Sequence, residues 1–112
     1  MFIAMNRFEV QRGREAEFEG IWRNRDSHIA TVPGFVEFHL LRGPESADAT
    51  LYSSHTVWRS RDDFEAWTHS EAFRAAHRSS GEAKGLYRGH PVFEGFEVVA
   101  LTRPAATAGE AA

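Results

Sequence analysis

The sequence predicts a single α+β domain, because its length and its two hydrophobic periods both indicate one. The chain has 112 residues, which is a usual length for one domain. Apolar residues alternate with a period of two in four segments, as in half-buried strands, and recur with a helical period in two others. In chain order these segments are strand, helix, strand, strand, helix and strand.

The first strand and the first helix are predicted from a change of period near the start of the chain. Residues 2–10 alternate, and the face that carries their large apolar side chains also carries Asn6. One helix is then predicted over residues 14–32, and Pro33–Gly34 after it ends the helix. Arg25 is interpreted as a residue of this helix that extends its charged head into solvent. The residues with helical spacing are Phe18, Ile21, Trp22, Arg25, Ile29 and Val32.

Three further strands and a second helix are predicted for the rest of the chain. The second helix is predicted over residues 62–79, after an N-cap region that begins at Ser60, with a bend near residues 68–70. A polar turn is predicted at residues 43–48 and a long loop at residues 80–90. The order βαββαβ is that of the ferredoxin-like fold, in which two helices cover one face of an antiparallel sheet. The strands are residues 35–41, 51–58 and 92–101.

The opposite face of the predicted sheet is also apolar, which predicts a homodimer. Two helices cover only one face, and soluble monomers rarely expose an apolar patch as large as the other face would be. A two-fold pair that packs sheet on sheet, a dimeric α/β barrel, buries this patch, and partial cover by loops is the alternative. The residues concerned include Met1, Ile3, Met5, Leu51 and Val57.

The composition excludes several classes of function. The chain has 13 Lys and Arg and 16 Asp and Glu, a net charge of −3, so it is not expected to bind nucleic acid. The absence of cysteine excludes disulfides and thiolate metal sites. No segment has the pattern of a secretion signal or a membrane span, and we expect a cytoplasmic protein with no membrane partner. We expect a domain over residues 1–103 and a disordered tail over residues 104–112, which lack large apolar side chains.

The sequence contains no motif for a nucleotide, a flavin or a metal held by the protein alone. The six His lack the i, i+4 spacing and the HExxH motif of zinc sites. Glycine-rich phosphate loops, the GxSxG motif and the dinucleotide fingerprint are also absent. An oxygenase built on this chain therefore needs a substrate, or a bound haem, that itself helps to activate oxygen.

Three residues are candidates for such chemistry, and each has a plainer alternative. His77 follows two alanines near the end of the second helix, where a neutral imidazole could ligate haem iron or simply face solvent. Trp67 could touch the same ligand across a bend in the helix, or be a core residue beside Phe64. Asn6 lies on an apolar face, so its amide needs a hydrogen-bond partner, either a neighbouring backbone group or oxygen bound to iron.

Three segments resemble a known family. They are Met5–Phe8, Pro33–Phe35 and Phe64–His77. Together they resemble the antibiotic biosynthesis monooxygenase superfamily, and most closely its IsdG-type haem-degrading branch. The resemblance extends over nearly the whole chain, from Phe2 to about Leu101.

The resemblance implies a function and a role for each of the three candidates. It implies that His77 is the proximal ligand of haem iron, that Asn6 hydrogen-bonds the distal ligand, and that Trp67 presses the haem out of plane. Haem would be substrate and cofactor together, and oxygen would open it to a tetrapyrrole that releases the iron. Electrons would come from an external donor, a reductase or a small-molecule reductant, since the chain has no nicotinamide or flavin motif.

Three cations are candidate partners of the haem propionates. Arg78, Lys84 and Arg88 lie in or beside the predicted loop that follows His77. The alternative for each of them is an ordinary solvent-exposed position.

Two other functions stay open at this point. A cofactor-free monooxygenase of the same superfamily, acting on a quinol or polyphenol, needs no His ligand, so His77 distinguishes the two. A haem-binding protein without enzymatic activity is the other possibility.

Overall fold

The strands and helices follow the order that the sequence predicts. The computed structural model describes residues 1–25, 28–71, 73–74, 86–89 and 91–105. The elements of this part of the chain are β1 (Phe2–Gln11), α1 (Glu15–Arg23), the 3-10 turn η1 (Ile29–Thr31), β2 (Phe35–Glu45), β3 (Ala49–Trp58), α2 (Arg61–Thr68) and β4 (Val92–Glu97).

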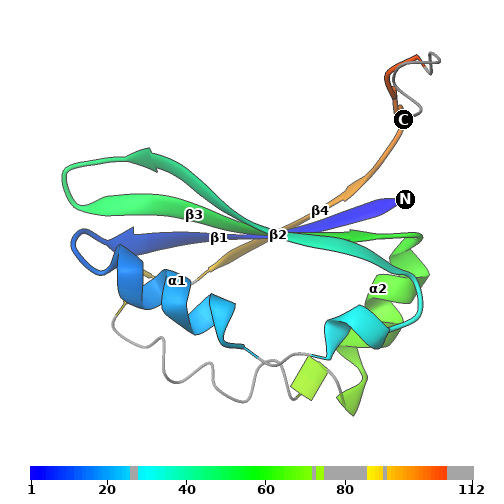
Figure 1. The fold of residues 1–112 in the computed structure, drawn as a ribbon, viewed down its shortest axis with the longest axis horizontal. Helices are drawn as coiled ribbons and strands as arrows, with labels where there is room; N and C mark the ends of the chain where they lie inside the picture. Colours follow the sequence, from blue (N-terminus) through cyan, green and yellow to red (C-terminus); the bar gives the residue numbers. More distant parts are fainter. Residues whose placement is uncertain (26–27, 72, 75–85, 90, 106–112) are drawn as a thin grey trace.

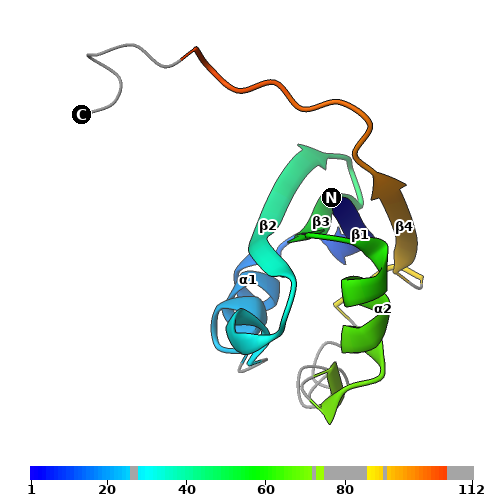
Figure 2. The ribbon, with the colours of Figure 1, turned by 90° about the vertical axis from the view of Figure 1, so that its right-hand side faces the viewer.

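The four strands form one antiparallel sheet in the order β2-β3-β1-β4. Both helices lie on the same face of this sheet, α1 towards one end and α2 towards the other (Figures 1 and 2). This arrangement confirms the predicted α+β, ferredoxin-like fold. The central pair, β1 and β3, is in register from Phe2 opposite Trp58 to Gln11 opposite Ala49, so alternate residues of both strands face the helices.

The first helix is shorter than the sequence predicts. α1 ends at Arg23, whereas the predicted helix continued to Val32. The backbone N–H of Asn24 makes the last α-helical hydrogen bond. The helical spacing continues past this point because Arg25 and Ile29 face the same cavity as Trp22 of α1, which repeats the spacing without a continuous helix.

The second helix bends where the sequence predicts a bend. α2 ends at Thr68, and Ser70 caps a new helical turn by accepting a hydrogen bond from the backbone N–H of Phe73 (3.2 Å). Three predicted features lie outside the described residues: the last part of this helix (75–79), most of the following loop (80–85 and 90) and most of the tail (106–112).

The edge strands also depart from their predicted lengths. β4 ends at Glu97, earlier than predicted, because its partner β1 begins at Phe2 and offers no further pairing. One more hydrogen bond joins Val98 N–H to the Met1 carbonyl (2.9 Å), and the chain then runs away from the sheet (Figure 2). β2 continues to Glu45, into the predicted turn, since an edge strand accommodates Gly and Pro at a shift in register.

Two separate apolar clusters lie between the sheet and the helices. On β1 they are separated by a single residue of the same face, Asn6, and on β3 by Ser54 and Thr56. Because α1 and α2 cover opposite ends of the sheet, neither helix fills its middle (Figure 1). The buried members are Phe8, Val10, Phe18, Tyr52 and Leu86 in one cluster and Phe2, Ala4 and Trp58 in the other.

Two carboxylates anchor α1 to β3. Glu15 and Glu19, one helical turn apart, accept hydrogen bonds from the hydroxyls of Thr50 (2.8 Å) and Tyr52 (2.5 Å). The Tyr52 bond, and after it the guanidinium of Arg42, lowers the pKa of Glu19. Burial, and after it the bond to Glu19, raises the pKa of Tyr52 to about 12. At neutral pH an ionised carboxylate therefore accepts from a neutral phenol.

This anchor predicts a pH-dependent loss of stability in a Glu19 variant. Replacing Glu19 with Gln is expected to lower the free energy of unfolding by about 1–2 kcal/mol at pH 7, because it weakens charge-assisted hydrogen bonds. The pKa of Glu19 is lower in the folded state than in the unfolded state. Its contribution is therefore present above the unfolded pKa and is lost as the pH falls through the folded pKa. The variant should approach the wild type in acid, below about pH 4, which urea unfolding measures.

Glu17 provides the matched control, because it lies on the same helix but in an exposed ion pair with Arg14 (2.8 Å). Glu17→Gln is expected to change the free energy of unfolding much less than Glu19→Gln does, because solvent screens an exposed ion pair. Equal losses in the two variants would contradict the anchoring role of Glu19.

Candidate functional site

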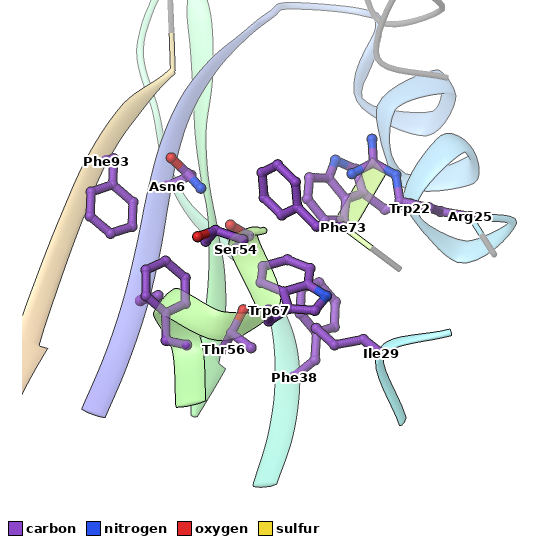
Figure 3. Close-up of a pocket in the computed structure, with 13 residues that line it drawn as sticks. Asn6, Trp22, Arg25, Ile29, Phe38, Ser54, Thr56, Trp67, Phe73 and Phe93 are labelled. Atoms are coloured by element: carbon purple, nitrogen blue, oxygen red, sulfur yellow. The ribbon is translucent and has the colours of Figure 1, made fainter. Parts of the chain in front are cut away.

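A cavity of about 540 Å³ lies over the middle of the sheet, in the gap between the two apolar clusters (Figure 3). α1 and η1 border it on one side and α2 on the other. Its volume falls within the range of small-molecule sites in proteins. The sheet therefore forms the floor of this cavity, and the helices and edge strands form its walls.

The floor consists of small and polar residues. Ala4 and Asn6 of β1 are paired with Thr56 and Ser54 of β3, and all four line the cavity. They share the face that carries the two apolar clusters, so an amide and two hydroxyls are presented to an otherwise apolar space.

The walls of the cavity are aromatic. Trp22 of α1 stacks on Phe38 of β2, with ring centroids 5.6 Å apart and ring planes 10° from parallel. Phe64 of α2 stacks in the same way on Phe93 of β4, at 5.7 Å and 10°. Aromatic walls of this kind favour a flat, largely apolar ligand.

Trp67 belongs to both the core and the cavity. Its ring packs on Trp58 of the buried cluster (centroids 5.4 Å apart) and on Phe64, and it also lines the cavity. On its other side Phe73 meets it edge to face at 4.9 Å. The bend after Thr68 allows residues from both helical segments to face one cavity. The two interpretations that the sequence leaves open, core residue and cavity residue, thus describe the same position.

The side chain of Asn6 is half-buried on the floor of the cavity (Figure 3). No hydrogen bond joins its amide to any residue in the described part of the chain. The backbone partner considered from the sequence is therefore not found there. The amide is placed to bind a polar atom of a ligand or a water molecule.

Arg25 does not lie where the sequence predicts it, on a continuous first helix with its charge in solvent. It lies beyond the end of α1, and its guanidinium carbon is 4.1 Å from the ring centroid of Trp22, a cation–π contact. It is the only charged residue among the described residues that line the cavity. The sequence contained a sign of this place at the cavity, because Arg25 occurs at a position where the spacing favours an apolar residue. The prediction of one continuous helix assigned its charge to solvent instead.

The remaining predicted site residues are not brought to this cavity within the described part of the chain. His77, Arg78 and Lys84 lie outside the described residues. Arg88 lies beside a separate, open and polar cavity, where its Nη1 is 3.6 Å from Oδ2 of Asp48, and it does not line the aromatic cavity.

The described residues contain no group of three or more His, Asp or Glu side chains that could hold a metal ion. None of their helices is long and apolar enough to cross a membrane.

Comparison with known protein families decides the class of the chain. Residues 1–79, well over half of it, match the family of antibiotic biosynthesis monooxygenases. The chain belongs to this family. Membership confirms the resemblance seen in the sequence and places the chain among monooxygenases. The matched region contains Asn6 and Trp67 and extends beyond His77.

Several members and structural neighbours of the family are similar to the chain. A protein named heme-degrading monooxygenase, from Bacillus thuringiensis (strain Al Hakam), is 30% identical over 81 residues, or 72% of this chain and 75% of that protein. The heme-degrader MhuD from Mycobacterium tuberculosis, solved with two hemes bound in its active site, is 30% identical with a TM-score of 0.71, over 92% of this chain and 100% of MhuD. SnoaB, a cofactor-independent oxygenase from Streptomyces nogalater, is 26% identical with a TM-score of 0.66, over 93% and 97%. The similar proteins thus include oxygenases that act with and without haem.

Proposed function

We propose that the chain is a haem-degrading monooxygenase. It would open the porphyrin ring of haem with oxygen and with electrons from an external donor, and release the iron. The observation that carries this proposal is that Asn6 and Trp67 line the same aromatic cavity. The 30% identity to proteins named for heme degradation supports it independently.

The residues that line the cavity suit a haem molecule. The aromatic walls match a flat apolar ring, and the volume of about 540 Å³ is large enough for a cofactor-sized ligand. Arg25 supplies a cation at the same cavity, which suits the carboxylate of a propionate. In the proposal Arg25 is added to the candidate propionate partners, and Arg88, which lies at the separate polar cavity, stays a more distant candidate.

Each protein residue has a limited task in this proposal. When bound, haem is both the substrate and the group that activates oxygen. His77, four residues after the cavity residue Phe73, would ligate the iron. The Asn6 amide would donate a hydrogen bond to a polar ligand atom from the floor of the cavity, and the indole of Trp67 would contact the haem. Arg78 and Lys84 are further candidates for the propionates.

The proposal extends to partners and location. We propose a homodimer that packs the uncovered faces of two sheets together, because Leu41 and Phe96 on that face are about half exposed in one chain. The electron donor would be a reductase or a small-molecule reductant, and the protein would be cytoplasmic. The domain would occupy residues 1–103 and the tail residues 104–112.

A hemin titration tests the proposed function directly. A one-to-one complex with a Soret band, lost under ascorbate and oxygen with release of iron, is the expected result. The similarity to SnoaB makes a cofactor-free oxygenase of a quinol or polyphenol the second candidate. A chain that gives no Soret band with hemin supports that candidate. Tight binding without turnover indicates a haem-binding protein that is not an enzyme.

Arg25 gives a prediction about substrate binding. Arg25→Gln is expected to weaken hemin binding about 3- to 10-fold, because it removes the cation at the cavity. The wild type should also prefer hemin over its dimethyl ester, and the variant should lose that preference. Spectral titration with both ligands measures this.

Arg23→Gln is the control, since Arg23 is an exposed arginine of α1 that does not line the aromatic cavity. An unchanged preference for hemin over its ester in Arg25→Gln would remove Arg25 from the site.

A further inference from the structure

The hydroxyl residues of β3 differ in what they contact. Thr50, Tyr52, Ser54 and Thr56 follow one another on the face towards the helices. Thr50 and Tyr52 donate to carboxylates of α1, as described above. Ser54 and Thr56 face the gap between the helices, and both line the cavity. The first two hydroxyls are therefore explained by the packing of α1, and the last two are not.

The hydroxyls of Ser54 and Thr56 lie in buried residues. Ser54 is 5% exposed and Thr56 is 8% exposed. In the described part of the chain no residue forms a hydrogen bond with either hydroxyl. Neither hydroxyl oxygen is itself fully buried, because both residues line the cavity and open into it. Polar groups in such a place are usually satisfied by ordered water or by a ligand, so a partner inside the cavity can bind these two hydroxyls.

Ser54 is also directly opposite the other unsatisfied group of the floor. Asn6 and Ser54 are cross-strand partners in the antiparallel register, and directly opposed side chains have Cβ atoms about 4.5–5.5 Å apart. Figure 3 shows both side chains on the floor of the same cavity. The amide can donate and accept, and so can the hydroxyl, so the two can bind one atom between them. Thr56 is opposite Ala4, which offers no such second group.

We propose that Ser54 is a second ligand-binding residue of the site, and that its hydroxyl and the Asn6 amide together hold one oxygen-sized ligand. In the haem-free protein this ligand is a water molecule. In the haem complex, which rests on the proposed function, it is the small ligand bound on the Asn6 side of the ring. A hydroxyl at this place supplies a proton donor that an apolar residue could not supply.

The first test uses the haem-free protein and a high-resolution crystal structure. The expected result is an ordered water within hydrogen-bond distance of both the Ser54 hydroxyl and the Asn6 amide, lost in Ser54→Ala and kept in Ser54→Thr. Ser53→Ala is the matched control, because it removes the same hydroxyl one residue away on the opposite face of the sheet. A wild-type structure with no water between the two groups overturns the inference.

The second test uses the ferric haem complex and fluoride, a small anion that accepts hydrogen bonds and whose binding is followed by the absorption spectrum. Ser54→Ala is expected to weaken fluoride binding about 3- to 10-fold, the effect of one lost hydrogen bond, while hemin affinity stays unchanged. Ser54→Thr should restore the affinity, and Ser53→Ala should match the wild type.

The two tests separate this inference from the proposed function. If the wild type binds hemin but fluoride affinity is the same in Ser54→Ala, the inference fails and the proposed function stands. If the wild type shows no Soret band with hemin, the proposed function fails, and the water in the haem-free structure alone decides the role of Ser54.

Discussion

His77→Ala is expected to abolish haem turnover while the protein stays folded. In the proposed function the imidazole of His77 is the side chain that ligates the iron, so its removal leaves the iron without a protein ligand. Loss of residues that merely support a metal ligand costs about 10- to 100-fold in affinity or activity, so loss of the ligand itself should cost about 100-fold or more. Turnover of hemin under ascorbate and oxygen, together with the position of the Soret band, measures the effect.

His69 supplies the control for this variant. It is an exposed histidine that follows α2 as its C-cap, and it does not line the cavity. His69→Ala should therefore keep the wild-type spectrum and turnover. An unchanged Soret band in His77→Ala would show that another group ligates the iron and would end the proposed mechanism.

Asn6→Ala is expected to separate binding from oxidation. The amide is one polar group among many apolar contacts, so hemin affinity should change by no more than about 3-fold. A hydrogen bond to an atom that gains charge in the transition state contributes more to the rate than to binding. Removing one such bond lowers kcat about 100-fold or more in other enzymes. We therefore expect a large fall in kcat with a nearly constant dissociation constant for hemin.

A polar residue at the rim of the same cavity is the control for Asn6. Thr68 lines the cavity, but its hydroxyl donates to the backbone carbonyl of Glu65 (2.6 Å) and so has its own partner. Thr68→Ala should leave kcat close to that of the wild type. If Asn6→Ala retained full turnover, the amide would have no part in the chemistry.

Much of the fold follows from local patterns in the sequence. The alternation in β1 determines which residues face the helices, because successive side chains of a strand point to opposite faces. The bend after Thr68 is also predictable, since Ser70 is a residue type that starts a helical turn. The same patterns identify Asn6 as unusual and Trp67 as a residue of the core or of a ligand site, and the structure places both at one cavity.

The predictions that were wrong depend on contacts between distant segments. The predicted first helix ran too far because Arg25 and Ile29 line the cavity at helical spacing, and the spacing alone cannot distinguish this from packing in a helix. β4 ends at Glu97 because this residue is opposite the first residue of β1. The register between the two strands sets this end, and the sequence of β4 alone does not contain it. The place of Arg88 beside Asp48 also depends on contacts between distant segments, and its role toward a propionate stays a prediction.

The fold class, the faces of the strands, the family resemblance and two residues of the cavity, Asn6 and Trp67, follow from the sequence alone. The split of the described core into two clusters, the cavity between them and the place of Arg25 and Ser54 at its border follow only from how the elements pack. This is because alternation and helical period are set by neighbours along the chain. A cavity is set by the distance between two helices that never contact the middle of the sheet they share.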